Sequence, residues 1–179
     1  MLEGRPVGFK SDFDFGDDAP FGVVDGPADV GFVVSLDDTV QPFARTLHLV
    51  PRIATVGVGC RKGTDSALLA QAVAEALAEA RISRHAVTTL ASIDVKQDER
   101  AIHDLAKSEG WDLKFYTADE LAAVPGAFSS SEFVRRAVGV DNVCERAACA
   151  DGAALVLGKQ AGGGVTVAIS CNRDRVCVA

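Results

Sequence analysis

The fold is decided by a stretch that reads Ala54-Thr55-Val56-Gly57-Val58-Gly59-Cys60-Arg61-Lys62-Gly63-Thr64. A short run rich in β-branched residues ends in glycines and two cations, and an alanine-rich helical pattern follows at once. This order is typical of a strand, a tight loop and the N-terminus of a helix. Glycines let a backbone approach a ligand closely, and a helix start offers unpaired N–H groups with a partial positive charge. The stretch therefore predicts an anion site, to which Arg61 and Lys62 add two full charges.

The composition indicates a globular protein with one proper domain and an appendage, since 48% of its 179 residues are hydrophobic and 24% are charged. A net charge of −7 argues against nucleic-acid binding, which needs a basic face. No apolar run is as long as a membrane span and no signal-peptide pattern is found, so we expect no membrane partner and a cytoplasmic location. Five cysteines without a C-x-x-C pair predict free thiols and no structural metal.

Residues 1–52 differ in composition from the rest of the chain. Six of the nine phenylalanines and most of the prolines lie in this segment. Two short strands are predicted, at residues 30–35 and 45–50, without any long helical pattern. The segment looks too small and too interrupted to bury its own core. We interpret it as a small β-rich piece or linker that precedes a domain at residues 53–179.

From residue 53 onward, strand patterns alternate with helix patterns. The predicted strands are residues 54–59, 87–93 and 113–116, and helices at residues 65–80 and 98–108 come between them. Helical crossovers of this kind join parallel strands. The helical residues expected to face the core are Leu68, Leu69, Ala72, Val73, Ala76, Leu77, Ala80, Ile102, Leu105 and Ala106.

Capping residues mark the boundaries of these helices. Thr64 is predicted to be the N-cap of the first helix, where Asp65 favours the helix dipole. Gly110 is predicted to end the second helix. Residues 117–120 form a capping-box pattern that opens a short third helix, and Pro125-Gly126 closes it.

The last part of the domain combines a helix at residues 141–150 with two strands at residues 153–157 and 165–170. A loop at residues 158–164 joins these strands, most simply as an antiparallel pair. The whole pattern predicts a three-layer α/β/α domain with a mixed, largely parallel sheet. In such sheets, ligands bind beyond the carboxyl ends of the parallel strands, where the glycine-rich loop lies.

The glycine-rich loop does not match a nucleotide-phosphate motif. Lys62 precedes Gly63, whereas the lysine of a P-loop follows its glycine. Asp94 lies farther along the chain from the glycines than the ~20 residues that usually separate a dinucleotide-binding glycine motif from its acidic residue. A nucleotide role is therefore a weak interpretation, and a tight turn that only carries surface cations is the structural alternative.

Further candidates lie outside this loop. Asp94 and Lys96 are two residues apart at the end of a strand, so that in an extended chain their side chains point the same way. Asp94 suits a general base, and Lys96 suits a group that holds a carboxylate or stabilises an oxyanion. A surface ion pair is the alternative. Ser129 and Ser131 either cap a helix or bind an anion at its start. Lys159 lies in a glycine-rich loop that either closes over a ligand or only faces solvent.

Cys60 is the cysteine with a reason to be reactive. The neighbouring Arg61, Lys62 and helix start are expected to lower its pKa, which favours the nucleophilic thiolate. Simple packing of the thiol is the alternative.

Six ordered blocks of the sequence resemble one known family. The blocks are residues 56–64, 90–99, 115–121, 124–134, 139–145 and 159–168. Together they resemble the C-terminal domain of the cobalamin biosynthesis protein CbiG, which is related to CobE, over about residues 53–170. The preceding segment looks like the end of that family's middle region, and the family's N-terminal domain is absent here.

The resemblance implies that the substrate is a cobalt-containing precorrin, a ring edged with carboxylates, in which cobalt belongs to the substrate and no separate cofactor is needed. It also implies the hydrolytic opening of the ring-A lactone of cobalt-precorrin-5A, with release of acetaldehyde. The alternative is a non-catalytic module that binds or hands over a corrinoid. Such a module would work with a separate N-terminal CbiG domain or with neighbouring pathway enzymes.

Roles for individual residues follow from physical reasoning rather than from the resemblance. We expect cations to hold substrate carboxylates, the loop backbone to donate N–H groups, and Asp94 or Glu120 to act as the general base. The predicted substrate-binding residues are Gly59, Cys60, Arg61, Lys62, Gly63, Thr64, Lys96, Ser129, Ser131 and Lys159.

Overall fold

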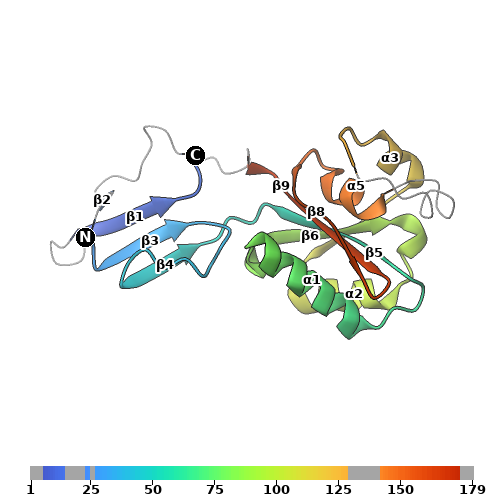
Figure 1. Ribbon diagram of the computed structural model, residues 1–179, viewed down its shortest axis with the longest axis horizontal. Coiled ribbons are helices and arrows are strands. Elements are labelled where there is room, and N and C mark those ends of the chain that lie inside the picture. Colours follow the sequence, from blue (N-terminus) through green and yellow to red (C-terminus); the bar gives the residue numbers. More distant parts are fainter. Residues whose placement is uncertain (1–5, 15–22, 25–26, 129–141, 174–179) are drawn as a thin grey trace.

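The computed structural model describes residues 6–14, 23–24, 27–128 and 142–173, which form two separate β-sheets (Figure 1). The larger, five-stranded sheet carries helices on both faces, and the smaller, four-stranded sheet is built from the N-terminal segment. The predicted α/β fold, with a β-rich segment before it, is confirmed.

The larger sheet is mixed, as predicted, with the strand order β7-β6-β5-β9-β8. The parallel strands β5, β6 and β7 pair in sequence order outward from the centre, whereas β9 runs antiparallel to both β5 and β8. Burial on both faces explains why the central strands read as nearly continuous apolar runs. The strands are β5 (Ala54–Cys60), β6 (Val87–Ile93), β7 (Asp112–Tyr116), β8 (Ala154–Gly162) and β9 (Val165–Cys171).

Helices cover the two faces of this sheet (Figure 1). Helices α1 and α2 pack on one face and contribute to the main core, while α3 and α5 lie on the other. Two short 3₁₀ turns, η1 and η2, flank β6. The helical elements are α1 (Ser66–Ala80), η1 (Arg84–Ala86), η2 (Asp94–Lys96), α2 (Arg100–Glu109), α3 (Ala118–Ala123) and α5 (Val143–Cys149).

Helix α1 begins one residue later than predicted. Its N-cap is Asp65, not Thr64, because the Asp65 carboxylate accepts hydrogen bonds from the backbone N–H groups of Ala67 and Leu68, at 2.9 and 3.1 Å. The helix buries Leu69, Val73, Ala76 and Leu77, but Leu68 is 39% exposed. The expectation that Leu68 faces the core is therefore wrong, since it lies at the edge of the apolar stripe.

The segment after β6 is also different from the prediction. Asp94 and Lys96 lie in the 3₁₀ turn η2, so they do not project together from an extended chain. Helix α2 starts at Arg100, with Glu99 at its N-cap, rather than at Asp98. Its end at Gly110 is confirmed, because this residue adopts a left-handed conformation with φ of 69°.

Helix α5 lies unusually close to the sheet because β5 has a glycine beneath it. A Cβ atom on Gly57 would lie 2.0 Å from the carbonyl oxygen of Cys144 and 2.7 Å from the backbone nitrogen of Ala148. The glycine therefore makes room for the helix backbone, which is a packing role rather than the ligand contact expected of this loop region.

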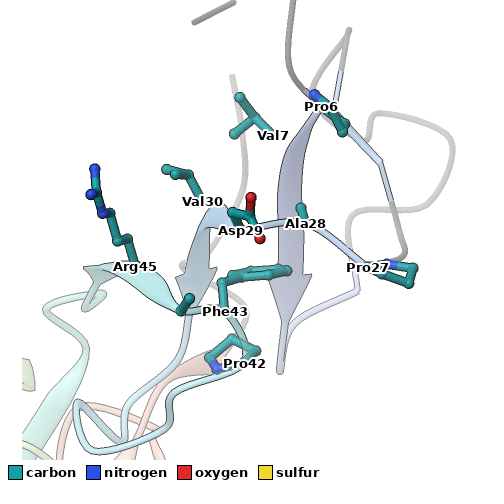
Figure 2. Close-up of a pocket in the computed structure, with 10 residues that line it drawn as sticks. Pro6, Val7, Pro27, Ala28, Asp29, Val30, Pro42, Phe43 and Arg45 are labelled. Atoms are coloured by element: carbon teal, nitrogen blue, oxygen red, sulfur yellow. The ribbon is translucent and has the colours of Figure 1, made fainter.

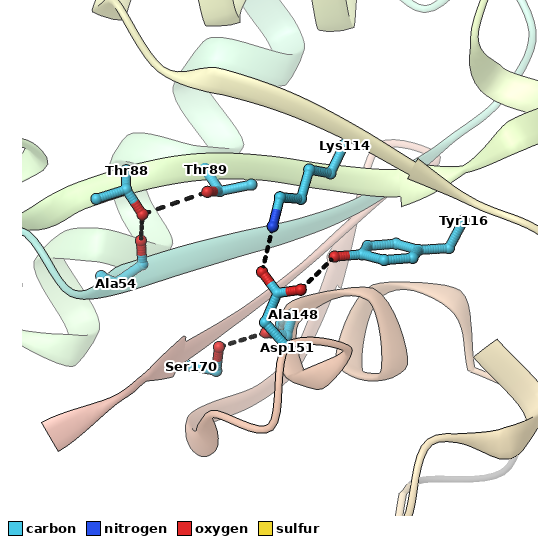
Figure 3. A network of polar contacts seen from close by, with 8 residues as sticks. All are labelled: Ala54, Thr88, Thr89, Lys114, Tyr116, Ala148, Asp151 and Ser170. Carbon is cyan, nitrogen blue, oxygen red and sulfur yellow. Dashed lines mark hydrogen bonds and ion pairs between the residues drawn. The ribbon is translucent and has the colours of Figure 1, made fainter. Parts of the chain in front are cut away.

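The C-terminal end of α5 is tied to the sheet by a polar network (Figure 3). Asp151 accepts hydrogen bonds from the Lys114 ammonium at 2.5 Å and from the Tyr116 hydroxyl at 3.1 Å, both on the edge strand β7. Ser170 of β9 donates its hydroxyl proton to the carbonyl of Ala148, at 2.5 Å. These contacts fix the orientation of the helix whose N-terminal end borders the site described below.

The antiparallel hairpin is confirmed, but its predicted seven-residue loop is not. Strands β8 and β9 continue almost to the tip, which is a two-residue turn at Gly163 and Gly164. Both glycines have positive φ, 58° and 84°, the conformation that closes tight two-residue hairpins. A turn of this kind is short and conformationally restricted, so it is poorly suited to act as a mobile flap.

The N-terminal segment forms a parallel sheet in the order β2-β1-β3-β4. Strands β3 and β4 match the two predicted strands, whereas β1 and β2 were not predicted from the sequence. Phe43 lies across Gly8 and Gly31, where a Cβ atom would approach the ring to 2.1 and 2.4 Å, and it borders a cavity of about 780 Å³ (Figure 2). The segment thus buries some apolar side chains of its own, contrary to expectation. The strands are β1 (Val7–Ser11), β2 (Val23–Val24), β3 (Val30–Val34) and β4 (Arg45–Leu49).

Candidate functional site

A cavity of about 530 Å³ opens at the carboxyl ends of β5 and β6. The tip of the β8–β9 hairpin and the N-terminal end of α5 complete its walls, so the cavity lies where open α/β sheets bind ligands. Its volume is within the range of small-molecule sites. It is lined by Gly59, Cys60, Arg61, Ile93, Lys96, Asn142, Val143, Cys144, Lys159, Ala161, Gly162, Gly163, Gly164, Val165 and Thr166.

The cavity brings together five of the twelve site residues predicted from the sequence. Gly59, Cys60, Arg61, Lys96 and Lys159 line it, although they come from three separate segments of the chain. The predicted residues that do not line it are Lys62, Gly63, Thr64, Asp94 and Glu120. Ser129 and Ser131 fall outside the described residues.

The backbone of the glycine-rich loop is already hydrogen-bonded within the chain. The N–H of Arg61 donates to the carbonyl of Gly164 at 3.1 Å, and the N–H of Thr64 donates to the carbonyl of Arg61 at 3.3 Å. The N–H of Gly63 donates to the Glu99 carboxylate at 2.9 Å. The structure therefore does not support the expectation that these amides serve a ligand, because each one already has an acceptor.

The start of α1 is satisfied in the same way. The Asp65 carboxylate occupies the position that an anionic ligand would take at a helix N-terminus. Together with Glu99 it neutralises the predicted anion site from inside the protein. The cations of this region, rather than the N–H groups of Arg61, Gly63 and Thr64, are what it offers to a ligand in the cavity.

Lys96 is held at the cavity by an ion pair. Its ammonium lies 3.3 Å from Glu99 Oε1, and the two side chains are only 18% and 12% exposed. The hydrogen bond from Gly63 and, more weakly, the neighbouring Lys96 keep the pKa of Glu99 below its ordinary value. Glu99 thus joins the loop to Lys96. Sequence reasoning missed it, although its spacing of three residues from Lys96 was a usable signal.

The Cys60 thiol does not have the lowered pKa that was expected from the sequence. Burial raises the pKa of Cys60, and this effect outweighs the opposing influence of Lys96. Burial also raises the pKa of Cys144, across the cavity, to about 11. Both thiols are therefore neutral near pH 7, and the expected thiolate character of Cys60 is wrong because desolvation dominates over nearby positive charge.

The wall formed by α5 contains polar groups that sequence reasoning had not selected. The Asn142 side chain caps α5 by accepting the N–H of Glu145 at 3.1 Å, and it also accepts the Cys144 thiol at 3.4 Å. Glu145 is only 3% exposed, and its Oε1 accepts the backbone N–H of Lys159 at 2.7 Å. Lys159 in turn borders the cavity. Only the resemblance block that includes residues 142–145 had drawn attention to this region.

The two predicted general bases have different positions. Glu120 accepts hydrogen bonds from the backbone N–H and the hydroxyl of Thr117, at 2.7 and 2.9 Å, which completes the predicted capping box and lowers its pKa. Asp94 directly follows Ile93, which lines the cavity, so it is the nearer of the two along the chain. Neither carboxylate belongs to the lining.

The chemistry of the cavity is that of a largely apolar site with cations at its border. Arg61, Lys96 and Lys159 supply these cations, and such a combination suits a flat apolar ligand edged with carboxylates. Within the described residues, no group of three or more His, Cys, Asp and Glu side chains is arranged to hold a metal ion. No helix in the same residues is both long and apolar enough to cross a bilayer.

Known proteins are similar to this chain over the same domain. Residues 54–170 match the family described as Cobalamin synthesis G C-terminus. A cobalt-precorrin-5A hydrolase from Priestia megaterium is 30% identical over 67% of this chain, and one from Salmonella typhimurium is 34% identical over 56%. The crystal structure of CobE, a protein from the cobalamin (vitamin B12) biosynthetic pathway, matches with a TM-score of 0.63 at 28% identity and covers 68% of this chain and 92% of that one. The chain spans 32% and 28% of the length of the two hydrolases.

Proposed function

This chain belongs to the Cobalamin synthesis G C-terminus family, and we propose that its cavity binds a cobalt-containing precorrin during hydrolytic opening of the ring-A lactone of cobalt-precorrin-5A. The observation that carries the proposal is the placement of Arg61, Lys96 and Lys159 around one apolar cavity at the ends of the parallel strands. The names of the two hydrolases that it resembles supply the reaction.

The proposed ligand matches the cavity in both shape and charge. A corrin precursor has an apolar macrocycle and a border of acetate and propionate groups, so apolar walls suit the ring and ammonium or guanidinium groups suit the border. A local group of cations also explains how a protein with a net charge of −7 can attract a polyanion. We expect one edge of the ring to enter the cavity.

The reaction needs a water molecule activated next to the lactone carbonyl. Addition of water opens the lactone to a carboxylate and an alcohol, and cleavage of the adjacent carbon–carbon bond then releases acetaldehyde while the macrocycle accepts the electron pair. Lys96 or Lys159 would stabilise the oxyanion that forms at the carbonyl. We assign the general-base role to Asp94 rather than to Glu120, because the Glu120 carboxylate is engaged in its capping box.

The test is to incubate the chain alone with cobalt-precorrin-5A, to measure acetaldehyde and to titrate binding by the absorbance of the corrinoid. Release of acetaldehyde that is abolished in Asp94→Asn, with binding retained, is the expected result. Tight binding without any release would overturn the catalytic proposal for this chain and favour a binding or handover module. Absence of both would show that the cavity does not act on this ligand without a further domain.

A further inference from the structure

Strand β8 is irregular where it passes the cavity. Two of its residues, Gly158 and Lys159, face the single residue Ala168 of β9, so the ladder contains a bulge at this point. A bulge leaves one backbone N–H outside the ladder and changes the direction in which a side chain projects. Lys159 lies in the bulge and also lines the cavity.

The backbone group displaced by this bulge is bound by a buried carboxylate. Glu145 projects from α5, is 3% exposed, and accepts the N–H of Lys159 at 2.7 Å. The same oxygen also contacts the neighbouring residue, since a Cβ atom on Gly158 would lie 3.5 Å from it, at van der Waals distance. The carboxylate therefore belongs to the structure of the bulge.

The choice of a carboxylate at this place has a cost. A glutamine amide oxygen could accept the same hydrogen bond without the free-energy cost of burying a charge. The charges of both Glu145 and Lys159 act on the neighbouring Cys144 thiol, the first raising its pKa and the second lowering it. Both side chains therefore lie within electrostatic range of the Cys144 thiol at the wall of the cavity.

We propose that Glu145 is a positioning residue: through the bulge at Gly158–Lys159 it fixes the Lys159 ammonium at the cavity, where this cation binds a carboxylate of the ring-shaped ligand. The identity of the ligand rests on the proposed function, whereas the placement of Lys159 by Glu145 does not. In the absence of Glu145, residues 158–160 of β8 would pair regularly with β9, and Lys159 would turn away from the cavity.

A double-mutant cycle tests this proposal in the full chain. The probe is cobyrinic acid, a corrin with free carboxylates, and cobinamide, in which these groups are amides, is the matched control ligand. We expect Lys159→Met to weaken cobyrinic acid binding about tenfold and Glu145→Leu, which removes the hydrogen-bond acceptor, to weaken it about fivefold, whereas Glu145→Gln, which keeps an acceptor, is the matched control and should weaken it less. The double variant should be no weaker than Lys159→Met alone, because Glu145 acts through Lys159. Independent, multiplying losses would overturn the proposal.

A second measurement needs no ligand. Cross-strand NMR contacts between β8 and β9 report the register at residues 157–160 in the wild type, in Glu145→Gln and in Glu145→Leu. Loss of the bulge in Glu145→Leu supports the proposal, and an unchanged bulge in both folded variants overturns it. If the wild type does not bind cobyrinic acid but the bulge depends on Glu145, the proposed ligand is wrong and the positioning role stands.

Discussion

The two walls of the cavity use their backbone and side chains in different ways. The glycine-rich loop at residues 59–64 has the sequence of an anion site, yet the N–H groups of Arg61, Gly63 and Thr64 bind acceptors within the chain. The opposite wall, made of α5 and the hairpin, lacks the strand–loop–helix pattern of an anion site, yet its Lys159 lines the cavity. The difference teaches that glycines near a strand end do not by themselves indicate free amides.

Substitution of glycine by alanine should also have different effects on stability beneath α5 and in the glycine-rich loop. Gly57→Ala should destabilise the protein by about 3 kcal/mol, because the new Cβ would collide with the backbone of α5 at Cys144 and Ala148. Gly63→Ala is the control. It meets no atom within 4 Å and should cost only ~1 kcal/mol, for its φ of 72°. Urea unfolding measures both, and equal losses would contradict the close packing of α5.

If side chains rather than loop amides bind the ligand, removal of a cation should weaken ligand affinity only where that cation lines the cavity. Lys96→Met should weaken cobyrinic acid binding about tenfold through loss of a charge-assisted contact. Lys62→Met removes a neighbouring exposed cation that does not line the cavity, and it should change affinity less than about twofold. Absorbance titrations at fixed salt measure the difference. The reverse ranking would assign binding to the loop.

Glu99 joins the glycine-rich loop to Lys96 at the cavity, so its substitution should destabilise this wall and leave the wall made of α5 and the hairpin unchanged. Glu99→Gln should lower the free energy of unfolding by ~1 kcal/mol at pH 7, since it weakens contacts to Gly63 and Lys96. The lowered pKa of Glu99 means that its contribution is present above the ordinary value of 4.5 and is lost as the pH falls through the folded-state value. Unfolding curves of the two proteins should therefore converge at low pH. A gap that persists at pH 2 would exclude an electrostatic origin.

The smallest effect concerns Cys60, where the two walls meet. Because burial raises its pKa, alkylation by iodoacetamide at pH 7 should be about threefold or more slower than that of glutathione, and its rate should still be rising with pH at pH 9. Peptide mass spectrometry measures the modification at this residue, with Cys60→Ser as the blank. Rapid alkylation at pH 7 would restore the view that the neighbouring cations activate this thiol.

Much of the fold could be predicted because each element carries its own local signal. The period of α1, the capping box at Thr117 and the helix stop at Gly110 all depend on neighbours within a few residues. Boundaries failed where competing groups were close together, as at Thr64 and Asp65, both of which are good N-caps. The site was only partly predictable, since Glu145 and Glu99 act on residues that are distant in sequence.

The sequence by itself determined the alternation of strands and helices, the end of the sheet at which the cavity opens, and the resemblance that identifies the family. Only the tertiary structure decided which polar groups reach the cavity. Hydrogen bonds of the loop amides depend on Glu99 and Gly164, 36 and ~100 residues away, and the desolvation that raises the pKa of Cys60 depends on the packing of the whole site. Local patterns fix backbone geometry, but free donors and charges are what remain after long-range partners have been satisfied.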